Sequence, residues 1–413
     1  DQGETLFDNW TYSLVHKKKM VGLLQAGVRF DDVKRDPVWI ERGAYYLHQV
    51  GFDPAGTDGH IRLNTWRGWP SEPKAGKCDR LLDLLRFLCS AEQNYHEVFE
   101  WILCRISFSI QFPGKKLPSA IIMHGPQGTG KSTFFKALAR IFGDHHPTKN
   151  YSVILDQKAL QDNFNADWEN KLFVLAEEVV NSSDKWQLKN ELKELVSGET
   201  LRIRKVYRDG YPQKNLLFMV FLSNEKQPLP LDNDDRRHLV VWTPEPASYA
   251  FYDEVREEIE NGGIEALHQF FVDYDLSKFR PTDRPPMTES KTRLIGLSLP
   301  SEVRFVKEYL CGDTEWPVVP SLSADFYAAY VIWCRRNGEK HPRASHQFWG
   351  EIERLPGWKK YKQRVFNDLH CIGATTPKNV VIPPAAALQA SGTAKPDAEQ
   401  MDRWVTHGYI EFR

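Results

Sequence analysis

The sequence predicts an α/β protein with a central sheet, and three short apolar runs predict it. Residues 120–123 form an apolar run without helical periodicity that passes directly into a glycine-rich loop and then into a helix-forming segment. A second run, 172–176, ends in two glutamates, and a third, 216–222, ends in Ser-Asn. Short apolar runs bounded by turn residues are typical of buried strands, and helical segments between them favour an α/β fold.

The domain organisation follows from the length and from changes of pattern. A chain of 413 residues exceeds one ordinary hydrophobic core, so we expect two or three domains. Apolar residues at spacings of three and four predict two helices between Cys78 and Phe112. The expected divisions are an N-terminal mixed region over 1–77, a helical bundle over 78–116, an α/β core over 117–262, a connector over 263–300 and an α+β domain over 301–413.

The composition is that of a soluble globular protein, with 41% hydrophobic and 26% charged residues. Because the net charge is −1, any nucleic-acid surface must be a local basic patch. No apolar run is long enough to cross a bilayer and no signal-peptide pattern opens the chain, so we expect a cytoplasmic protein without a membrane partner. Six cysteines without metal-binding spacing are expected to be reduced. The first residue is Asp1 rather than Met, and we expect a piece of a longer protein.

The stretch from Ser119 to Arg140 has the order of strand, glycine-rich loop and helix that a phosphate-binding loop requires. Glycines allow backbone N–H groups to face a phosphate, and the following helix adds its positive N-terminal end. Lys131 is expected to reach the β- and γ-phosphates of ATP, and Ser132 is expected to hold Mg²⁺. A glycine-rich turn that binds nothing is the alternative. The residues predicted to bind ATP are Gly125, Pro126, Gln127, Gly128, Thr129, Gly130, Lys131, Ser132 and Thr133.

Two later strands end in residues that suit phosphate chemistry. A strand ending in Glu177 and Glu178 can supply one carboxylate for Mg²⁺ and another that polarises the attacking water. We assign Glu177 to the metal and Glu178 to the base, although the order could be reversed. Asn224, at the tip of a neighbouring strand, is placed to hydrogen-bond the attacking water or the γ-phosphate.

A basic hairpin and an arginine pair complete the candidate residues. Residues 200–207 alternate apolar with basic residues before a turn, which predicts a β-hairpin with a cationic, aromatic-bearing face. Such a face suits single-stranded DNA, although a merely solvated face is the alternative. Arg236 and Arg237 precede the strand at 238–242, where arginines usually form surface salt bridges but in a ring ATPase act on a neighbour's nucleotide. The residues predicted to bind DNA are Arg202, Arg204, Lys205, Tyr207, Arg208 and Lys214.

The ordered series GPQGTGKS, LFVLAEE, the basic hairpin after SGET, FLSN and DDRR resembles the motif set of superfamily 3 helicases, which are AAA+ ring helicases of viruses, phages and plasmids. The match covers about residues 63–242 and most resembles the phage and poxvirus primase-helicase branch. The resemblance implies an AAA+ P-loop core, a homo-oligomeric hexameric ring and a hairpin that lies in the pore on single-stranded DNA. The catalytic residues that it implies are Lys131, Glu177, Glu178, Asn224 as the sensor, and Arg236 or Arg237 acting in trans.

The resemblance extends to the parts around the core. It leaves open whether Lys115 or Lys116 is a second cation that acts in trans. The C-terminal domain is similar to the winged-helix-like tail of primase-helicases, and in that family an upstream primase or primase-polymerase domain is common in the same or a partner chain. The basic surface of this tail either contacts DNA or is merely solvated, and the sequence leaves both possibilities open. The basic residues of the tail are Arg335, Arg336, Lys340, Arg343, Lys359, Lys360, Lys362 and Arg364.

The motifs lead to one main functional hypothesis and two others. The main hypothesis is an ATP-dependent DNA helicase or translocase that serves phage or mobile-element replication. An ATP-dependent DNA clamp or ring scaffold that does not unwind is the alternative from a different class. A P-loop kinase or GTPase is the third, but the sequence has no Asn-Lys-x-Asp motif for guanine.

Overall fold

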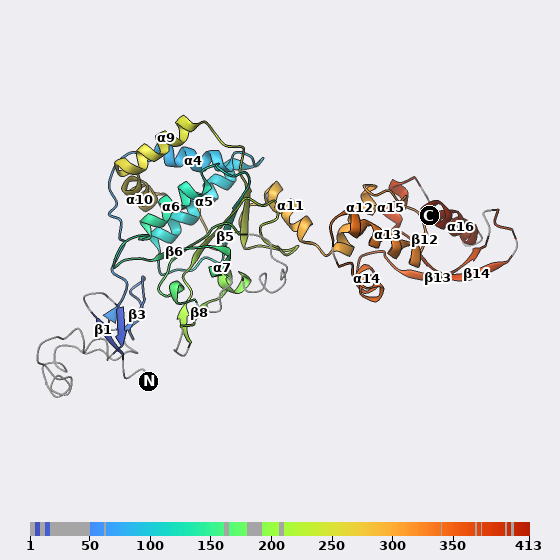
Figure 1. Cartoon of the computed structure of the whole chain (residues 1–413), viewed down its shortest axis with the longest axis horizontal. Helices are drawn as coiled ribbons and strands as arrows, with labels where there is room; N and C mark the ends of the chain where they lie inside the picture. The colour runs from blue at the N-terminus through green and yellow to red at the C-terminus, as the bar shows by residue number, and fades with distance from the viewer. Residues whose placement is uncertain are drawn as a thin grey trace, which may run out of the picture. The chain divides into compact units, whose positions relative to one another are not determined.

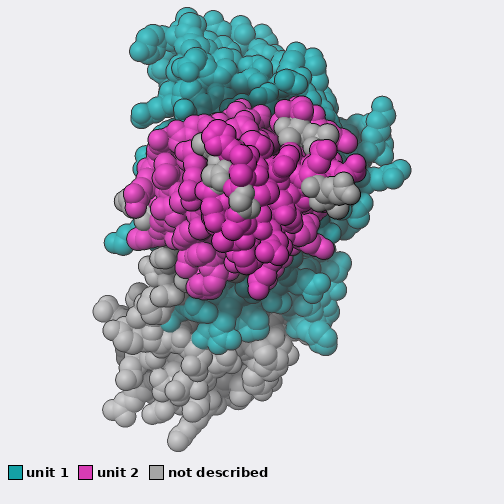
Figure 2. Space-filling model, turned by 90° about the vertical axis from the view of Figure 1, so that its right-hand side faces the viewer, with its two compact units in different colours: residues 1–294 teal, residues 295–413 magenta. Residues whose placement is uncertain are grey.

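The computed structural model describes residues 5–8, 13–16 and 50–413, apart from 62, 161–164, 180–191, 206–209, 340, 368–369, 373, 393–394 and 398–399. The chain divides into two compact units, residues 1–294 and 295–413, which Figure 2 shows in different colours. Figure 1 shows the helices and strands of both units, many of them labelled. Among the helices of the described residues, none has the length and apolar character to cross a bilayer.

The first unit contains a five-stranded parallel sheet, which confirms the predicted α/β fold with a central sheet. Its strands are β5 (Ala120–His124), β6 (Ser152–Leu155), β7 (Phe173–Ala176), β10 (Phe218–Ser223) and β11 (His238–Trp242). They lie in the order β11-β5-β10-β7-β6, and every neighbouring pair is parallel. Because parallel strands end at the same edge of a sheet, the segments after β5, β7 and β10 lie together.

Helices cover one face of this sheet (Figure 1). Alternate strand residues such as Ile121, Met123, Val220 and Leu239 belong to the same buried cluster as apolar residues of the helices. The predicted helices between Cys78 and Phe112 are present, and they share this core with the sheet. The elements are α4 (Asp79–Cys89), α5 (Tyr95–Gln111), α6 (Lys131–Ile141), α9 (Tyr249–Glu258) and α10 (Ile264–Asp273), the last two joined through a π-helical turn at Ile259–Gly263.

Smaller elements surround the sheet. The predicted basic hairpin is present as two antiparallel strands, β8 (Thr200–Ile203) and β9 (Tyr211–Lys214). The short elements α7 (Gln157–Leu160) and η3 (Ala166–Trp168) lie between β6 and β7 in the chain. Helix α11 (Glu289–Ser298) spans the boundary between the units. The remaining strand pairs are β1 (Thr5–Asp8) with β2 (Ser13–His16) and β3 (Val50–Gly51) with β4 (Leu63–Asn64).

The second unit is an α+β fold with an antiparallel sheet in the order β12-β14-β13. A cluster of aromatic residues that includes Phe305, Phe326 and Trp358 fills the space between its helices. A second cluster, with Val365, Val380 and Tyr409, lies between the sheet and the last helix. The elements in chain order are α12 (Ser301–Cys311), β12 (Ser321–Leu322), α13 (Ser323–Arg336), α14 (Ser345–Ile352), β13 (Lys360–Phe366), β14 (Thr375–Val381), α15 (Ala385–Ala390) and α16 (Met401–Phe412).

Candidate functional site

The glycine-rich loop joins the carboxyl end of β5 to the first residue of α6, as the sequence predicts (Figure 1). Gly125, Gly128 and Gly130 have φ angles of 142°, 82° and 91°, which residues with a side chain rarely adopt. A Cβ at Gly125 would lie 2.4 Å from the hydroxyl oxygen of Thr243, which follows β11. The loop therefore requires glycine both for its backbone angles and for the close approach of a neighbouring strand.

The side chain of Lys131 lies inside this loop. Its ammonium donates hydrogen bonds to the carbonyl oxygens of Gly125 at 3.0 Å and Pro126 at 2.7 Å, and only 6% of the residue is exposed. Burial lowers the pKa of Lys131 to about 8. An anion in the loop would face this ammonium together with the N-terminal end of α6, so the arrangement is suited to a phosphate group.

Glu177 and Glu178 follow β7 at the same edge of the sheet, but their side chains have different surroundings. Glu177 is half-buried, and its Oε2 lies 2.9 Å from the ammonium of Lys136 on α6. Lys136 is four residues after Ser132 and therefore lies on the same face of that helix. The side chains of Ser132 and Glu177, on adjacent elements, both offer oxygen atoms as metal ligands. This ligand set fits Mg²⁺, which takes few protein ligands beside phosphate and water.

Glu178 is exposed and has a φ angle of 54°, in the left-handed region that residues with a side chain seldom occupy. The residue after Glu178 anchors the turn to β10, because the Val179 N–H donates to the Leu222 carbonyl at 3.0 Å. The Ser223 hydroxyl donates to the Val179 carbonyl at 2.5 Å. Backbone strain of this kind persists only where the surroundings hold it, and it is often found at functional sites. The two carboxylates are therefore separated, one against α6 and one exposed at the sheet edge.

Asn224 lies at the same edge, because β10 is the strand between β5 and β7. Ser223 is in register with His124, so Asn224 follows β10 where Gly125 follows β5. The Gly125 N–H also donates to the Ser223 carbonyl at 3.2 Å. The structure thus brings the loop, the two glutamates and the exposed Asn224 together at one edge.

His124 is a residue at this edge that the sequence analysis missed. It is 3% exposed, and its Nδ1 lies 3.0 Å from the carbonyl oxygen of Glu225. Burial lowers the pKa of His124, so the neutral ring, which donates from Nδ1, is favoured. The hydrogen bond ties the strand before the loop to the segment that carries Asn224. A histidine that ends an otherwise apolar run was the available signal.

Arg236 and Arg237 lie at the opposite edge, before the first residue of β11. The five residues of β11 separate the two edges by ~16 Å. The Arg237 carbonyl accepts a hydrogen bond from the Ala120 N–H at 3.0 Å, and its Nε donates to the Ser197 hydroxyl at 3.0 Å. Arg236 is exposed. The Arg236 side chain is therefore accessible to another molecule, whereas the Arg237 side chain is engaged within the chain. Neither arginine lies beside the loop of its own chain.

Buried Asp235 holds the arginine segment in place. Its Oδ1 accepts from the backbone N–H groups of Arg237 at 3.2 Å and His238 at 3.0 Å, and its Oδ2 accepts from His238 Nδ1 at 2.9 Å. The Lys291 ammonium on α11 lies 3.3 Å from Oδ1. Burial would raise the pKa of Asp235, but the His238 hydrogen bonds and the Lys291 charge hold it well below its usual value. Asp235 is therefore a fixed anion under the arginine segment.

The base of the β8–β9 hairpin is held by the segment before β7. The Asn165 amide donates to the Arg202 carbonyl at 3.0 Å and accepts from the Arg204 N–H at 2.7 Å. Glu169 accepts from the Lys205 ammonium at 2.5 Å and from the Tyr211 hydroxyl. Of the predicted DNA-binding residues, Lys205 is thus ion-paired within the chain, whereas Arg202, Arg204 and Lys214 are exposed. Tyr207 and Arg208 lie outside the described residues.

The two lysines before β5 have different environments. The Lys116 ammonium donates to the Leu217 carbonyl at 2.6 Å and to the Asn215 side chain at 3.1 Å, and burial lowers its pKa well below the usual value. Lys115 is exposed, with its ammonium 4.7 Å from the centre of the Phe112 ring. Only Lys115 is accessible to another molecule.

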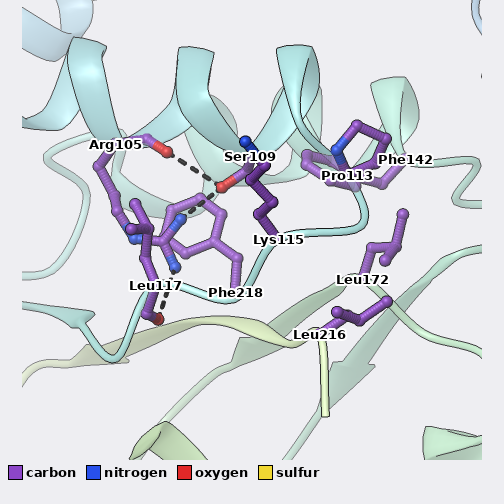
Figure 3. Close-up of a pocket in the computed structure, with 9 residues that line it drawn as sticks. All are labelled: Arg105, Ser109, Pro113, Lys115, Leu117, Phe142, Leu172, Leu216 and Phe218. Atoms are coloured by element: carbon purple, nitrogen blue, oxygen red, sulfur yellow. Dashed lines mark hydrogen bonds between the residues drawn. The ribbon is translucent and has the colours of Figure 1, made fainter. Parts of the chain in front are cut away.

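A small cavity lies at the amino end of the sheet, away from the glycine-rich loop (Figure 3). Arg105 is buried there, and its guanidinium carbon lies 4.1 Å from the centre of the Phe218 ring. Its Nε donates to the Ser119 hydroxyl at 3.0 Å, and burial lowers its pKa to about 9. The cation is therefore satisfied within the chain and supports the packing of α5 on the sheet. The lining residues are Arg105, Ser109, Pro113, Lys115, Leu117, Phe142, Leu172, Leu216 and Phe218.

The fold and the site together define a mixed α/β protein with a glycine-rich loop at the carboxyl edge of a five-stranded parallel sheet. Residues 123–237 match the model of DUF5906, a family of unknown function. A DNA primase-polymerase of Nitratiruptor phage NrS-1 is 33% identical over 210 residues, which are 48% of this chain and 27% of that protein. The matched part thus spans about a quarter of the relative's length.

Solved structures of the NrS-1 C-terminal region share the fold. An apo structure of that region has a TM-score of 0.63 and 18% sequence identity, and the match covers 92% of this chain and 95% of that one. A second apo structure, in the A form, has a TM-score of 0.61 and 17% identity, with 92% and 96% covered. The similarity therefore includes both units of the chain.

Proposed function

We propose that this chain is the ATP-driven DNA helicase or translocase part of a phage replication protein. The observation that carries the proposal is the strand order, in which β10 separates β5 from β7 and brings Asn224 beside the glycine-rich loop and the two glutamates. The similarity to a phage primase-polymerase supports a role in phage DNA replication. It also supports an upstream primase or polymerase domain in the same or a partner chain, acting in the host cytoplasm.

The residues at the loop have distinct roles in ATP hydrolysis. The backbone N–H groups of residues 127–133 and the Lys131 ammonium bind the β- and γ-phosphates. Ser132 and Glu177 hold Mg²⁺, which when bound offsets negative charge on the phosphates. Glu178, exposed at the edge, polarises the attacking water, and Asn224 orients it. The pairing of Glu177 with Lys136 favours Glu177 as the metal ligand, because it directs that carboxylate toward the helix that carries Ser132.

A ring of copies completes this site. Arg236 is exposed at the edge opposite its own loop, so it serves a nucleotide bound by a neighbouring copy. Arg237 is held by Ser197 within its own chain, and Lys116 is buried, so Arg236 and Lys115 are the proposed trans cations. The core is then an AAA+ module in a hexameric ring. In the second unit, the order helix, short strand, two helices and hairpin, with β12 pairing to β14, supports a winged-helix domain.

The β8–β9 hairpin is the proposed contact with single-stranded DNA in the pore. Arg202, Arg204 and Lys214 provide exposed cations for phosphates. The hairpin is tied through Asn165 and Glu169 to the segment that leads into β7, and β7 ends at the glutamates. This connection supports coupling between hydrolysis at one end of β7 and hairpin movement at the other.

The test compares ATP hydrolysis and strand displacement in the parent chain with Lys131→Ala and Glu178→Gln. We expect both variants to lose single-stranded-DNA-stimulated hydrolysis by on the order of a hundredfold or more, because each removes a group that acts on the phosphates or the water. Glu178→Gln should still bind ATP. Lys158→Ala, an exposed lysine on α7, is the matched control and should hydrolyse ATP like the parent.

Two results would contradict the proposal. Normal hydrolysis by Lys131→Ala would show that the site is wrongly assigned. Nucleotide-dependent assembly on DNA without strand displacement or translocation would favour the alternative function, an ATP-dependent clamp or ring scaffold.

A further inference from the structure

His124 is a polar residue at the end of a strand that is otherwise apolar. The four residues of β5 before it, Ala120 to Met123, are apolar and fully buried. Only 3% of His124 is exposed, and its Nε2 has no hydrogen-bond partner among the described residues. A buried polar atom without a partner costs free energy that an apolar residue would avoid. Stability alone therefore does not account for a histidine at this position.

The other ring nitrogen of His124 makes a specific contact across the edge of the sheet. Its Nδ1 lies 3.0 Å from the carbonyl oxygen of Glu225, and because a carbonyl oxygen only accepts, Nδ1 carries the proton. Glu225 follows Asn224, and both lie just beyond the last residue of β10. The hydrogen bond therefore holds the backbone beside Asn224 against the strand that leads into the glycine-rich loop.

The backbone held by His124 is also linked to the turn that carries Glu178. The Glu225 N–H donates to the Ser223 hydroxyl at 3.1 Å, and that hydroxyl donates to the Val179 carbonyl at 2.5 Å. Val179 is the residue after Glu178. A series of hydrogen bonds thus runs from the end of β5 through the segment after β10 to the turn after β7.

The His124 ring is fixed from the side of β11 as well. The Trp242 ring meets it edge to face, with the ring centres 5.0 Å apart and the planes at 87°. The Thr243 N–H donates to the His124 carbonyl at 2.8 Å, and the Trp242 N–H donates to the buried Glu92 carboxylate at 2.7 Å. These contacts hold the ring in place and leave its Nδ1 directed at the segment after β10.

We propose that His124 is a positioning residue for ATP hydrolysis, and that its Nδ1–H sets the place of Asn224 relative to phosphates bound in the loop. The proposal rests on the proposed function and goes beyond it, because His124 acts through the Glu225 carbonyl rather than by contact with the reacting atoms. Asn224 is exposed, so its backbone is what can be fixed before the nucleotide binds. A displacement of ~1 Å at such a group lowers turnover by on the order of a hundredfold.

The test separates the hydrogen bond of His124 from the volume of its ring. His124→Asn places an amide nitrogen where Nδ1 lies but leaves part of the space empty, whereas His124→Leu fills more of the space and has no donor. We expect His124→Leu to lower kcat by on the order of a hundredfold with KM for ATP changed by less than about threefold, and His124→Asn to keep kcat within about fivefold of the parent. A merely structural role predicts the opposite order, because the larger cavity in His124→Asn destabilises the fold more.

His268→Leu is the matched control, because His268 is a fully buried histidine in the same unit. It lies on α10 with its ring 5.9 Å from that of Trp69, and Trp69 contacts Phe142 at the end of α6 away from the loop. This control should hydrolyse ATP like the parent. An equal loss of kcat in the control, or a loss in His124→Asn as large as in His124→Leu, would overturn the proposal. A rise in KM that accounts for the whole loss would do the same.

Amide hydrogen exchange of the full chain without nucleotide gives a measurement that does not need hydrolysis. The amides of residues 223–226 should exchange on the order of tenfold faster in His124→Leu than in the parent, and His124→Asn should keep their protection. Equal exchange in His124→Leu and the parent would overturn the role of His124. Lys131→Ala should abolish hydrolysis and leave this exchange unchanged, so normal hydrolysis by Lys131→Ala would contradict the proposed function without altering the exchange result.

Discussion

At the scale of single residues, the neighbouring arginines Arg236 and Arg237 have identical side chains but different surroundings. Arg237 donates to Ser197 and its backbone pairs with β5, whereas Arg236 is exposed. Asp235 accepts a hydrogen bond from the backbone N–H of Arg237, the residue after Arg236, and Lys291 links that carboxylate to α11. A rigid support under an exposed arginine is what a group that acts on a neighbouring copy requires.

Replacement of these arginines tests the assignment. Arg236→Ala should lower ATP hydrolysis by on the order of a thousandfold, the effect of losing a trans arginine, and leave ATP binding to a single copy intact. Arg237→Ala should instead lower the free energy of unfolding by about 1 kcal/mol through the lost hydrogen bond, and retain most hydrolysis. Hydrolysis rates and denaturant unfolding measure the two effects.

Mixing inactive variants gives the control for action in trans. Arg236→Ala and Lys131→Ala subunits in one ring form some interfaces with both residues intact, so the mixture should recover part of the activity. A mixture as inactive as its components, or a larger loss in Arg237→Ala than in Arg236→Ala, would refute the assignment of Arg236.

At the scale of elements, the β8–β9 hairpin and the 165–170 segment form one unit. Asn165 holds the β8 side of the hairpin at Arg202 and Arg204, and Glu169 binds Lys205 and, on β9, Tyr211. Lys205 therefore has a carboxylate partner that a DNA phosphate would have to replace. This ion pair lowers the DNA affinity that Lys205 can add. It also holds the base of the hairpin beside the segment that leads into β7.

The Glu169→Gln variant measures this competition. Removing the charge should release the Lys205 ammonium for phosphate, raise single-stranded DNA affinity a few-fold and increase the salt slope by about 0.7. Asp167→Asn, an equal charge change at an exposed position two residues away, should alter neither quantity. Anisotropy with a labelled oligonucleotide provides both. Weaker binding by Glu169→Gln would show that Glu169 supports the hairpin rather than restrains it.

The sequence could predict the elements that depend on local pattern. The apolar run before Gly125, the glycine spacing and Lys131 determine the loop, and the runs before Glu177 and Asn224 determine neighbouring strands, because these features depend on residues close together in the chain. The pairings Arg237 with Ser197 and Lys205 with Glu169 join residues 40 and 36 positions apart. No periodicity encodes such contacts, so the sequence could not separate Arg236 from Arg237 or show that Lys205 is paired.

At the scale of the whole molecule, the loop and the arginine segment lie at opposite edges of one sheet, so the proposed action of Arg236 on the nucleotide needs a second copy. A site at the carboxyl edge lacks a cation from the amino edge of its own chain, since β11 separates them by ~16 Å. Only a head-to-tail arrangement brings Arg236 of one copy to the loop of the next, and such an arrangement closes into a ring when the rotation allows.

Nucleotide should therefore control assembly. A triphosphate in the loop gives Arg236 of the next copy an anionic partner, so binding and association stabilise each other by mass action. We expect a mass close to six times the 47.8 kDa chain with a non-hydrolysable ATP analogue and single-stranded DNA, and smaller species without them. Light scattering coupled to size exclusion measures the mass of these species.

Arg236→Ala should need a higher protein concentration to assemble, whereas Arg237→Ala should assemble like the parent. A chain that stays at 47.8 kDa with both ligands present would contradict the trans site, because no second copy would then supply its arginine.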